Sequence, residues 1–198
     1  MDIAKYQELV QWAQELGGVF TLADLKVALN QSSEVTLYRR LRELTSSGAL
    51  IKIKRGIYAT PTASLSTISS RIEPQSYIST GTILAGSAII GSIPARRVQA
   101  VKIGRPRTFT SELGTIEYLS IQPKLFMGYT DNASVKRATP EKAFLDVCYF
   151  HYKGKRFSFD IATDINREAL DMALIDVYLK KYDLRFMTFY KRLWKADA

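Results

Sequence analysis

The segment of residues 20–60 constrains the fold of this chain more than any other, because helix and turn signals follow one another there at short intervals. Thr21, followed by Asp24 three residues later, is typical of a capping box at the start of a short helix. Ser33 is the expected N-cap of a second, longer helix, and Gly48 is the residue type that commonly follows a helix C-terminus. Two helices joined by a short polar turn are therefore predicted.

The second of these helices has two chemically different faces. At about 100° per residue, Leu37, Leu41 and Leu44 form one apolar stripe, whereas the opposite face is mostly polar. Residues 50–54 then alternate between apolar and basic side chains, and a glycine-containing turn leads into a second short strand. A helix, a turn, a helix and a basic hairpin in this order predict a helix-turn-helix with a β-wing.

The flanking residues complete this predicted domain and mark its end. Residues 3–16 have the apolar spacing of an amphipathic helix, and Val19 and Phe20 form a short extended segment that we expect to pack beside the hairpin. We therefore place a winged helix-turn-helix domain at residues 1–60. Residues 61–76 are rich in serine and threonine and form a predicted connector, which has apolar residues at helical spacing.

Residues 77–198 form a predicted second domain. The stretch 77–95 is expected to form a tightly packed helix, because its glycine spacing fits neither a Walker loop nor a dinucleotide-binding fingerprint. Alternating residues between 98 and 120 predict an antiparallel sheet. The predicted fold class is thus α+β, with the N-terminal winged helix-turn-helix followed by a mixed α/β domain that contains a small antiparallel sheet.

The last third of the chain is expected to be mainly helical. A Thr-Pro pair starts one helix, in which Lys142 and Asp146 are spaced for an i,i+4 ion pair. A second helix is predicted at residues 166–182 as a central packing element, and a third begins after Asp183. The third helix interleaves basic and aromatic residues, a pattern that suits either a nucleic-acid surface or a packed face with a solvated rim.

The net charge favours a polyanionic partner such as nucleic acid. The chain has 28 basic and 19 acidic residues, a net charge of +9, although a moderate net charge also keeps proteins soluble. Residues 1–70 hold 8 of the basic and 6 of the acidic residues, so most of the excess lies in residues 71–198. Five cations there are candidates for additional phosphate contacts, or for a solvated hairpin tip: Arg96, Arg97, Lys102, Arg105 and Arg107.

Signatures of catalysis and of metal binding are lacking in the sequence. Cys148 is the only cysteine, which excludes an intramolecular disulfide and a multi-cysteine zinc site. His151 is the only histidine, and no nucleophile stands in a recognisable setting. We expect no enzymatic activity, no cofactor and no metal. No apolar run approaches the ~20 residues of a membrane span and the N-terminus lacks a signal peptide pattern, which predicts a cytoplasmic protein without membrane association.

Several segments of the chain, taken in order, resemble the AbiEi family of antitoxins and transcriptional regulators. They are KRGIYA in the wing, YISTGTILAGSAIIG, an arginine-rich hairpin, GTIEYLSI, FMGY and the helix TPEKAFLD, and together they cover nearly the whole chain. The resemblance implies a winged-helix DNA-binding domain joined to an α/β antitoxin domain at residues 77–198. It also implies a type IV toxin–antitoxin or abortive-infection operon whose promoter is repressed through repeats in the DNA.

From the outward helix face and this resemblance we predict a sequence-specific repressor that binds double-stranded promoter DNA. Base contacts are assigned to Thr36, Arg39 and Glu43, phosphate contacts to Ser33, Arg40 and Arg42, and wing contacts to Lys52, Lys54 and Arg55. The resemblance implies a nucleotidyltransferase-like toxin as functional partner, opposed without a stable complex. We expect a monomer in solution or a dimer on inverted repeats. The alternatives are a winged-helix protein-interaction module and a solitary regulator without a toxin.

Overall fold

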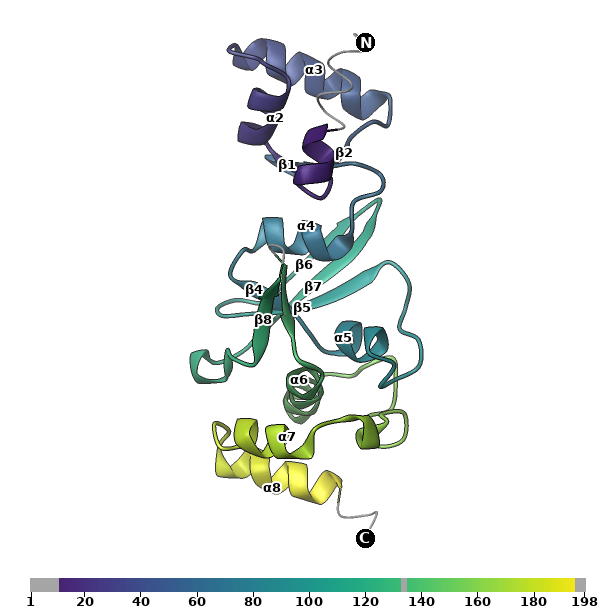
Figure 1. Ribbon diagram of the computed structural model, residues 1–198, viewed down its shortest axis with the longest axis vertical. Coiled ribbons are helices and arrows are strands. Elements are labelled where there is room, and N and C mark those ends of the chain that lie inside the picture. Colours follow the sequence, from purple (N-terminus) through teal and green to yellow (C-terminus); the bar gives the residue numbers. More distant parts are fainter. Residues whose placement is uncertain (1–10, 133–134, 195–198) are drawn as a thin grey trace. The chain divides into compact units, whose positions relative to one another are not determined.

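The computed structural model describes residues 11–132 and 135–194, and the chain divides into two compact units (Figure 1). Unit 1 comprises the residues up to Pro74 together with Phe109–Thr115, and unit 2 comprises the remainder. Each unit has its own core and is described by itself. Among the described residues, no helix is both long enough and apolar enough to cross a membrane.

Unit 1 contains the predicted helix-turn-helix and wing. Its elements in chain order are β1 (Val19–Thr21), α2 (Leu22–Ala28), α3 (Glu34–Ser46), β2 (Ile51–Lys54), β3 (Ile57–Ala59) and α4 (Leu65–Ile72). The three strands form an antiparallel sheet in the order β1-β3-β2, so β3 is central and the β2–β3 hairpin is the wing. α4 packs against β1 and β3. The predicted order of helix, turn, helix and hairpin is therefore confirmed.

The capping and termination residues predicted from the sequence lie at the ends of the two helices α2 and α3. The backbone N–H of Thr21 donates to Asp24 Oδ2 at 2.8 Å, and the backbone N–H of Asp24 donates to Thr21 Oγ1 at 3.2 Å, which is the capping box of α2. Ser33 is the N-cap residue of α3, although its side chain makes no capping hydrogen bond. Gly48 follows the helix with φ of 73°, a conformation that favours glycine.

An apolar cluster in unit 1 joins the helices to the sheet. Trp12, Ala13 and Leu16 pack against it, and residues 11–15 are helical, whereas the first part of the helix predicted at 3–16 lies outside the described residues. The buried members of the cluster come from β1, both helices of the helix-turn-helix and the wing: Phe20, Leu25, Leu29, Leu37, Leu41, Leu44, Leu50 and Tyr58. The cluster therefore fixes α3 relative to the wing.

The remaining elements of the chain belong to unit 2, except that residues 109–115 of β6 and β7 belong to unit 1. The strands among these elements are β4 (Ser76–Ile78), β5 (Arg97–Lys102), β6 (Arg107–Ser111), β7 (Gly114–Ser120), β8 (Tyr129–Asn132) and β9 (Val135–Ala138). Its helices are α5 (Gly81–Gly86), η1 (Pro123–Leu125), α6 (Pro140–Tyr152), η2 (Arg167–Ala169), α7 (Met172–Leu179) and α8 (Leu184–Leu193). The six strands have the order β6-β7-β5-β4-β9-β8, with β4 antiparallel to β5 and parallel to β9. This sheet is larger than the small antiparallel sheet that the sequence indicates.

The prediction of one helix over residues 77–95 is largely wrong. Tyr77 and Ile78 lie in β4, between β5 and β9, and the helix is confined to α5. Both side chains are almost completely buried. A short apolar run that is buried on both faces has no polar alternation, so its periodicity cannot distinguish a strand from a helix.

The helix predicted at residues 166–182 is shorter and more superficial than expected. Asp171 Oδ1 accepts a hydrogen bond from the backbone N–H of Leu174 at 3.0 Å, so this side chain caps α7 and the helix begins at Met172. Val177 on α7 is 55% exposed. The central packing element of unit 2 is instead α6, which packs against α5, α7 and α8 and lies between the sheet and the α7–α8 pair (Figure 1).

A buried polar network ties α6 to β4. Lys142 Nζ pairs with Asp146 Oδ1 as predicted, and both side chains are fully buried. Asp146 Oδ2 also accepts hydrogen bonds from Tyr77 Oη at 3.0 Å and from Ser79 Oγ at 2.7 Å. Burial lowers the pKa of Lys142, and Asp146 acts in the opposite direction. One carboxylate thus serves as acceptor for three donors that water cannot reach.

Replacing Asp146 with alanine is expected to lower the free energy of unfolding of unit 2 by about 3–5 kcal/mol, because it leaves a buried ammonium group unpaired. The hydroxyl groups of Tyr77 and Ser79 also lose their acceptor. Urea unfolding followed by fluorescence in a Trp12→Phe background measures the effect, since Trp194 of unit 2 is then the one remaining tryptophan.

The matched control for this measurement is Asp176→Ala, since Asp176 is exposed on α7 of the same unit. A surface substitution of this kind is expected to change the free energy of unfolding by less than about 0.5 kcal/mol. Equal losses in the two variants would show that the network around Asp146 does not stabilise unit 2.

Candidate nucleic-acid interface

The two faces of α3 are fully separated in the structure. Leu37, Leu41 and Leu44 are 4%, 2% and 5% exposed and point into the core of unit 1. The opposite stripe runs through residues at positions i, i+4, i+7 and i+11, all of them exposed: Val35, Arg39, Arg42 and Ser46. A helix presented in this way, with two arginines on its outer face, has the chemistry to contact base edges and phosphates in a major groove.

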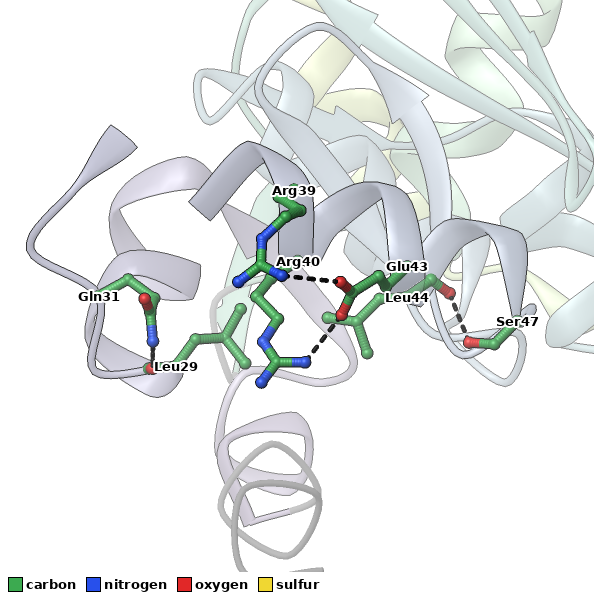
Figure 2. A network of polar contacts seen from close by, with 7 residues as sticks. All are labelled: Leu29, Gln31, Arg39, Arg40, Glu43, Leu44 and Ser47. Carbon is green, nitrogen blue, oxygen red and sulfur yellow. Dashed lines mark hydrogen bonds and ion pairs between the residues drawn. The ribbon is translucent and has the colours of Figure 1, made fainter. Parts of the chain in front are cut away.

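Glu43 holds two of the predicted DNA-contacting arginines (Figure 2). Its Oε2 lies 2.7 Å from Arg40 Nη1, and its Oε1 lies 3.8 Å from Arg39 Nη1. The Arg39 side chain is 66% exposed and the Glu43 side chain 48%, so the three groups lie at the surface. The predictions assigned Glu43 to base edges. In the free protein its carboxylate forms ion pairs with the guanidinium groups of Arg39 and Arg40.

The other predicted residues of α3 are distributed along its length. Ser33 is exposed at the N-cap, Thr36 is half-buried beside the first turn, and Arg42 is exposed. Arg40 is partly shielded, with 33% of its side chain exposed, and its position on the helix lies nearer to the core than that of Arg39. These positions bring Thr36, Arg39, Arg42 and Glu43 onto one continuous surface, with Arg40 at its edge.

The wing presents two exposed cations and one that is partly engaged. Lys52 is exposed on β2, and Arg55 is exposed at the turn, where Gly56 has φ of 81°. Lys54 is half-buried, and its Nζ lies 5.5 Å from the ring centroid of Phe109, within unit 1. A cation held over an aromatic face is less available to a phosphate than a solvated one. Lys52 and Arg55 are therefore the better candidates for backbone contacts.

The five cations predicted as additional phosphate contacts lie around the strands β5 and β6. Arg96, Arg97, Arg105 and Arg107 are exposed, and Lys102 is half-buried, with its Nζ 6.0 Å from the ring centroid of Tyr118. Gly104 has φ of 90° in the turn between the two strands, so this turn depends on glycine. The predicted hairpin at this turn is wrong, because β7 lies between β5 and β6 in the sheet. The structure places the five cations at the start of β5, at its end, in its connection to β6 and at the start of β6.

Two features of the α3 surface are missing from the predicted site. The Glu43 pairing could have been found, because Arg39 and Arg40 stand at i−4 and i−3 from Glu43, the spacings at which helix side chains meet. Val35 is 80% exposed on the same stripe as Arg39, and the helical period alone places it there.

Comparisons with known proteins bear on this interface. Residues 7–61 match a protein-family model described as "Transcriptional regulator, AbiEi antitoxin". The match covers the residues of the helix-turn-helix and the wing. The crystal structure of the RV2827C protein from Mycobacterium tuberculosis resembles this chain with a TM-score of 0.59 at 11% identity, over 92% of this chain and 76% of that one. At this identity the likeness shows a shared fold alone. The comparison with curated proteins found no match.

Cys148 and His151 are the cysteine and the histidine of the chain. Cys148 is buried, and burial raises the pKa of its thiol, which keeps it protonated. His151 packs beside the Phe189 ring, with ring centroids 6.1 Å apart. Within the described part of the chain, no group of three histidine, cysteine, aspartate or glutamate side chains is arranged to hold a metal ion.

Replacing Glu43 with alanine is expected to raise the affinity of the protein for arbitrary duplex DNA severalfold and to weaken its preference for a cognate site. Arg39 and Arg40 lose their shared anchor and become available to phosphates, which steepens the slope of log K against log[salt] by up to about 2. Fluorescence anisotropy over a salt series, with a cognate and a scrambled duplex, measures both quantities.

Glu34→Ala is the control for the charge change alone, since Glu34 is an exposed carboxylate in the first turn of the same helix. This variant is expected to bind all duplexes somewhat more tightly and to keep its sequence preference. If both variants lost the preference to the same extent, the loss would follow from charge and not from the release of the two arginines.

Proposed function

We propose that this chain is a sequence-specific DNA-binding transcriptional repressor, with α3 as the recognition helix and the β2–β3 hairpin as the wing. The observation that carries the proposal is the outer face of α3, which presents Arg39 and Arg42 within a domain that matches AbiEi transcriptional regulators. Arg39 and Thr36 contact base edges, whereas Arg42, Lys52 and the N-cap hydroxyl of α3 contact phosphates.

The burial pattern of α3 supports this assignment. The leucines of the helix are buried in the core, and its sequence holds three arginines against two glutamates, so cationic donors outnumber carboxylates. Such a surface suits the guanine and phosphate acceptors of duplex DNA better than it suits an apolar protein partner. We therefore favour DNA over a protein as the ligand of this face.

We further propose that the chain is the antitoxin of a type IV toxin–antitoxin or abortive-infection operon and represses its own promoter in the cytoplasm. The functional partner is then a nucleotidyltransferase-like toxin, opposed without a stable complex. The support is the family match of residues 7–61. Co-expression with such a toxin tests this part: Arg39→Ala should lose repression of the promoter and still restore growth, since repression depends on α3.

Replacing Arg39 with alanine is expected to cost about 1–3 kcal/mol of binding free energy on the cognate site and to relax specificity at one base pair. Lys52→Ala is the comparison variant, because Lys52 is an exposed cation of the wing that contacts phosphate. It is expected to weaken binding to all sequences alike and to reduce the salt slope by about 1. Duplexes selected from a random library by the wild-type protein provide the cognate site for anisotropy titrations.

Two outcomes would contradict the DNA-binding proposal. The first is that the wild-type protein enriches no sequence from the library. The second is binding that does not weaken between low and high salt, since contacts to phosphates release counterions. Either result would favour the alternative, in which the winged helix is a protein-interaction module.

The connection between β5 and β6, which contains Arg105, and the start of β6 at Arg107 are proposed to add phosphate contacts outside the residues that match the family model. The double variant Arg105→Ala/Arg107→Ala is expected to reduce the salt slope by about 2 and to leave the sequence preference unchanged, because phosphates carry no sequence information. Lys180→Ala/Lys181→Ala, which removes two exposed charges next to α7, is the control for net charge. Equal reductions in slope would show that Arg105 and Arg107 have no specific role.

A further inference from the structure

Val35 is an exposed apolar side chain on the face of α3 that is otherwise polar. It is 80% exposed, whereas Leu37, two residues further along the same helix, is 4% exposed. Burial of an apolar side chain stabilises a fold only to the extent that water is removed from it, so Val35 contributes little to the core of unit 1. A β-branched residue also lowers helix propensity slightly. The stability of the domain therefore gives no reason for a valine at this position.

We propose that Val35 is a specificity-determining residue that recognises the C5-methyl group of a thymine in the major groove. The inference rests on the proposed function, in which α3 is the recognition helix. Valine has neither a donor nor an acceptor in its side chain, so it cannot contact a phosphate or the polar edge of a base. The thymine methyl group is the one apolar group that base pairs present in the major groove.

The position of Val35 along α3 suits this contact. It is the second residue of the helix, after Glu34, and the N-terminal residues of a recognition helix are those that contact base edges. Arg39 follows one turn later on the same stripe, about 6 Å along the helix axis. Base pairs are stacked about 3.4 Å apart. The thymine should therefore lie within about two base pairs of the guanine that Arg39 contacts.

The two side chains differ in how their positions are fixed. Valine has one strongly preferred χ1 rotamer in a helix, so the methyl groups of Val35 are held in place without any neighbour. The Arg39 guanidinium is flexible by itself, and its Nη1 lies 3.8 Å from Glu43 Oε1. Val35 thus offers an apolar contact that loses little side-chain entropy on binding. The combination predicts a half-site in which a T·A pair lies close to a G·C pair.

The experiment uses a duplex that the wild-type protein selects from a random library, in which single thymines are replaced by uracil. This replacement removes only the C5-methyl group. Wild-type affinity is expected to fall roughly four-fold at one thymine, which corresponds to the burial of one methyl group. Val35→Ala should bind the thymine duplex with the same loss and should not distinguish uracil from thymine there. Val35→Thr, which retains a methyl group, should keep part of the discrimination.

Val27→Ala is the matched control, because Val27 is an exposed valine on α2, 62% exposed, and has no role in the proposed site. It is expected to respond to uracil as the wild-type protein does. Circular dichroism and thermal melting of both variants should match the wild type, since neither side chain is buried.

The result that overturns the inference is a Val35→Ala variant that loses affinity on uracil substitution as strongly as the wild type at every thymine. In that case the selected site, its salt dependence and the effect of Arg39→Ala would remain intact, and only the role of Val35 would fail. If the wild-type protein selects no sequence at all, the proposed function fails first, and the role of Val35 as a reader of DNA fails with it.

Discussion

The burial of Leu37, Leu41 and Leu44 is the interaction on which the proposed DNA-binding surface depends. These side chains pack with Phe20 and Leu50, and each leucine contributes roughly 1.5–3 kcal/mol when removed from water. A rotation of α3 by one residue would expose this stripe and bury an arginine without a partner. The core therefore fixes the rotation of the helix, and the outward position of its arginines is a consequence of packing.

Unit 2 is organised around a polar constraint. Asp146 accepts hydrogen bonds from two residues that precede it by 69 and 67 positions, Tyr77 and Ser79, in addition to its ion pair with Lys142. A buried polar group without a hydrogen-bond partner destabilises the folded state. The network therefore favours the one placement of β4 beside α6 in which all of its groups have partners. The apolar residues of α6 exclude water from the network, and the network sets the register against which they pack.

The exposure of a candidate-site residue could be predicted from the sequence where it depends only on the helical period and on the charge of the side chain. The exposure of Arg39, Arg42 and Ser33 follows from the leucine spacing of α3. The partial engagement of Lys54 does not, because its aromatic neighbour lies 55 positions away in sequence, at Phe109. We assigned Glu43 to base edges from its position on the helix alone. The structure shows that its carboxylate is shared between two arginines, a pairing that depends on the neighbouring side chains.

By itself, the sequence determined the features that arise within a few residues: the capping box at Thr21, the helix start before Lys142 and its i,i+4 ion pair, and the two faces of α3. These depend on backbone geometry and neighbouring side chains alone. Only the tertiary structure decided the order of the six-stranded sheet, the parallel pairing of β4 with β9 and the shared acceptor at Asp146. Strand partners and buried donors come from distant parts of the chain, and their choice minimises unpaired polar groups over the whole core, a condition that no local pattern encodes.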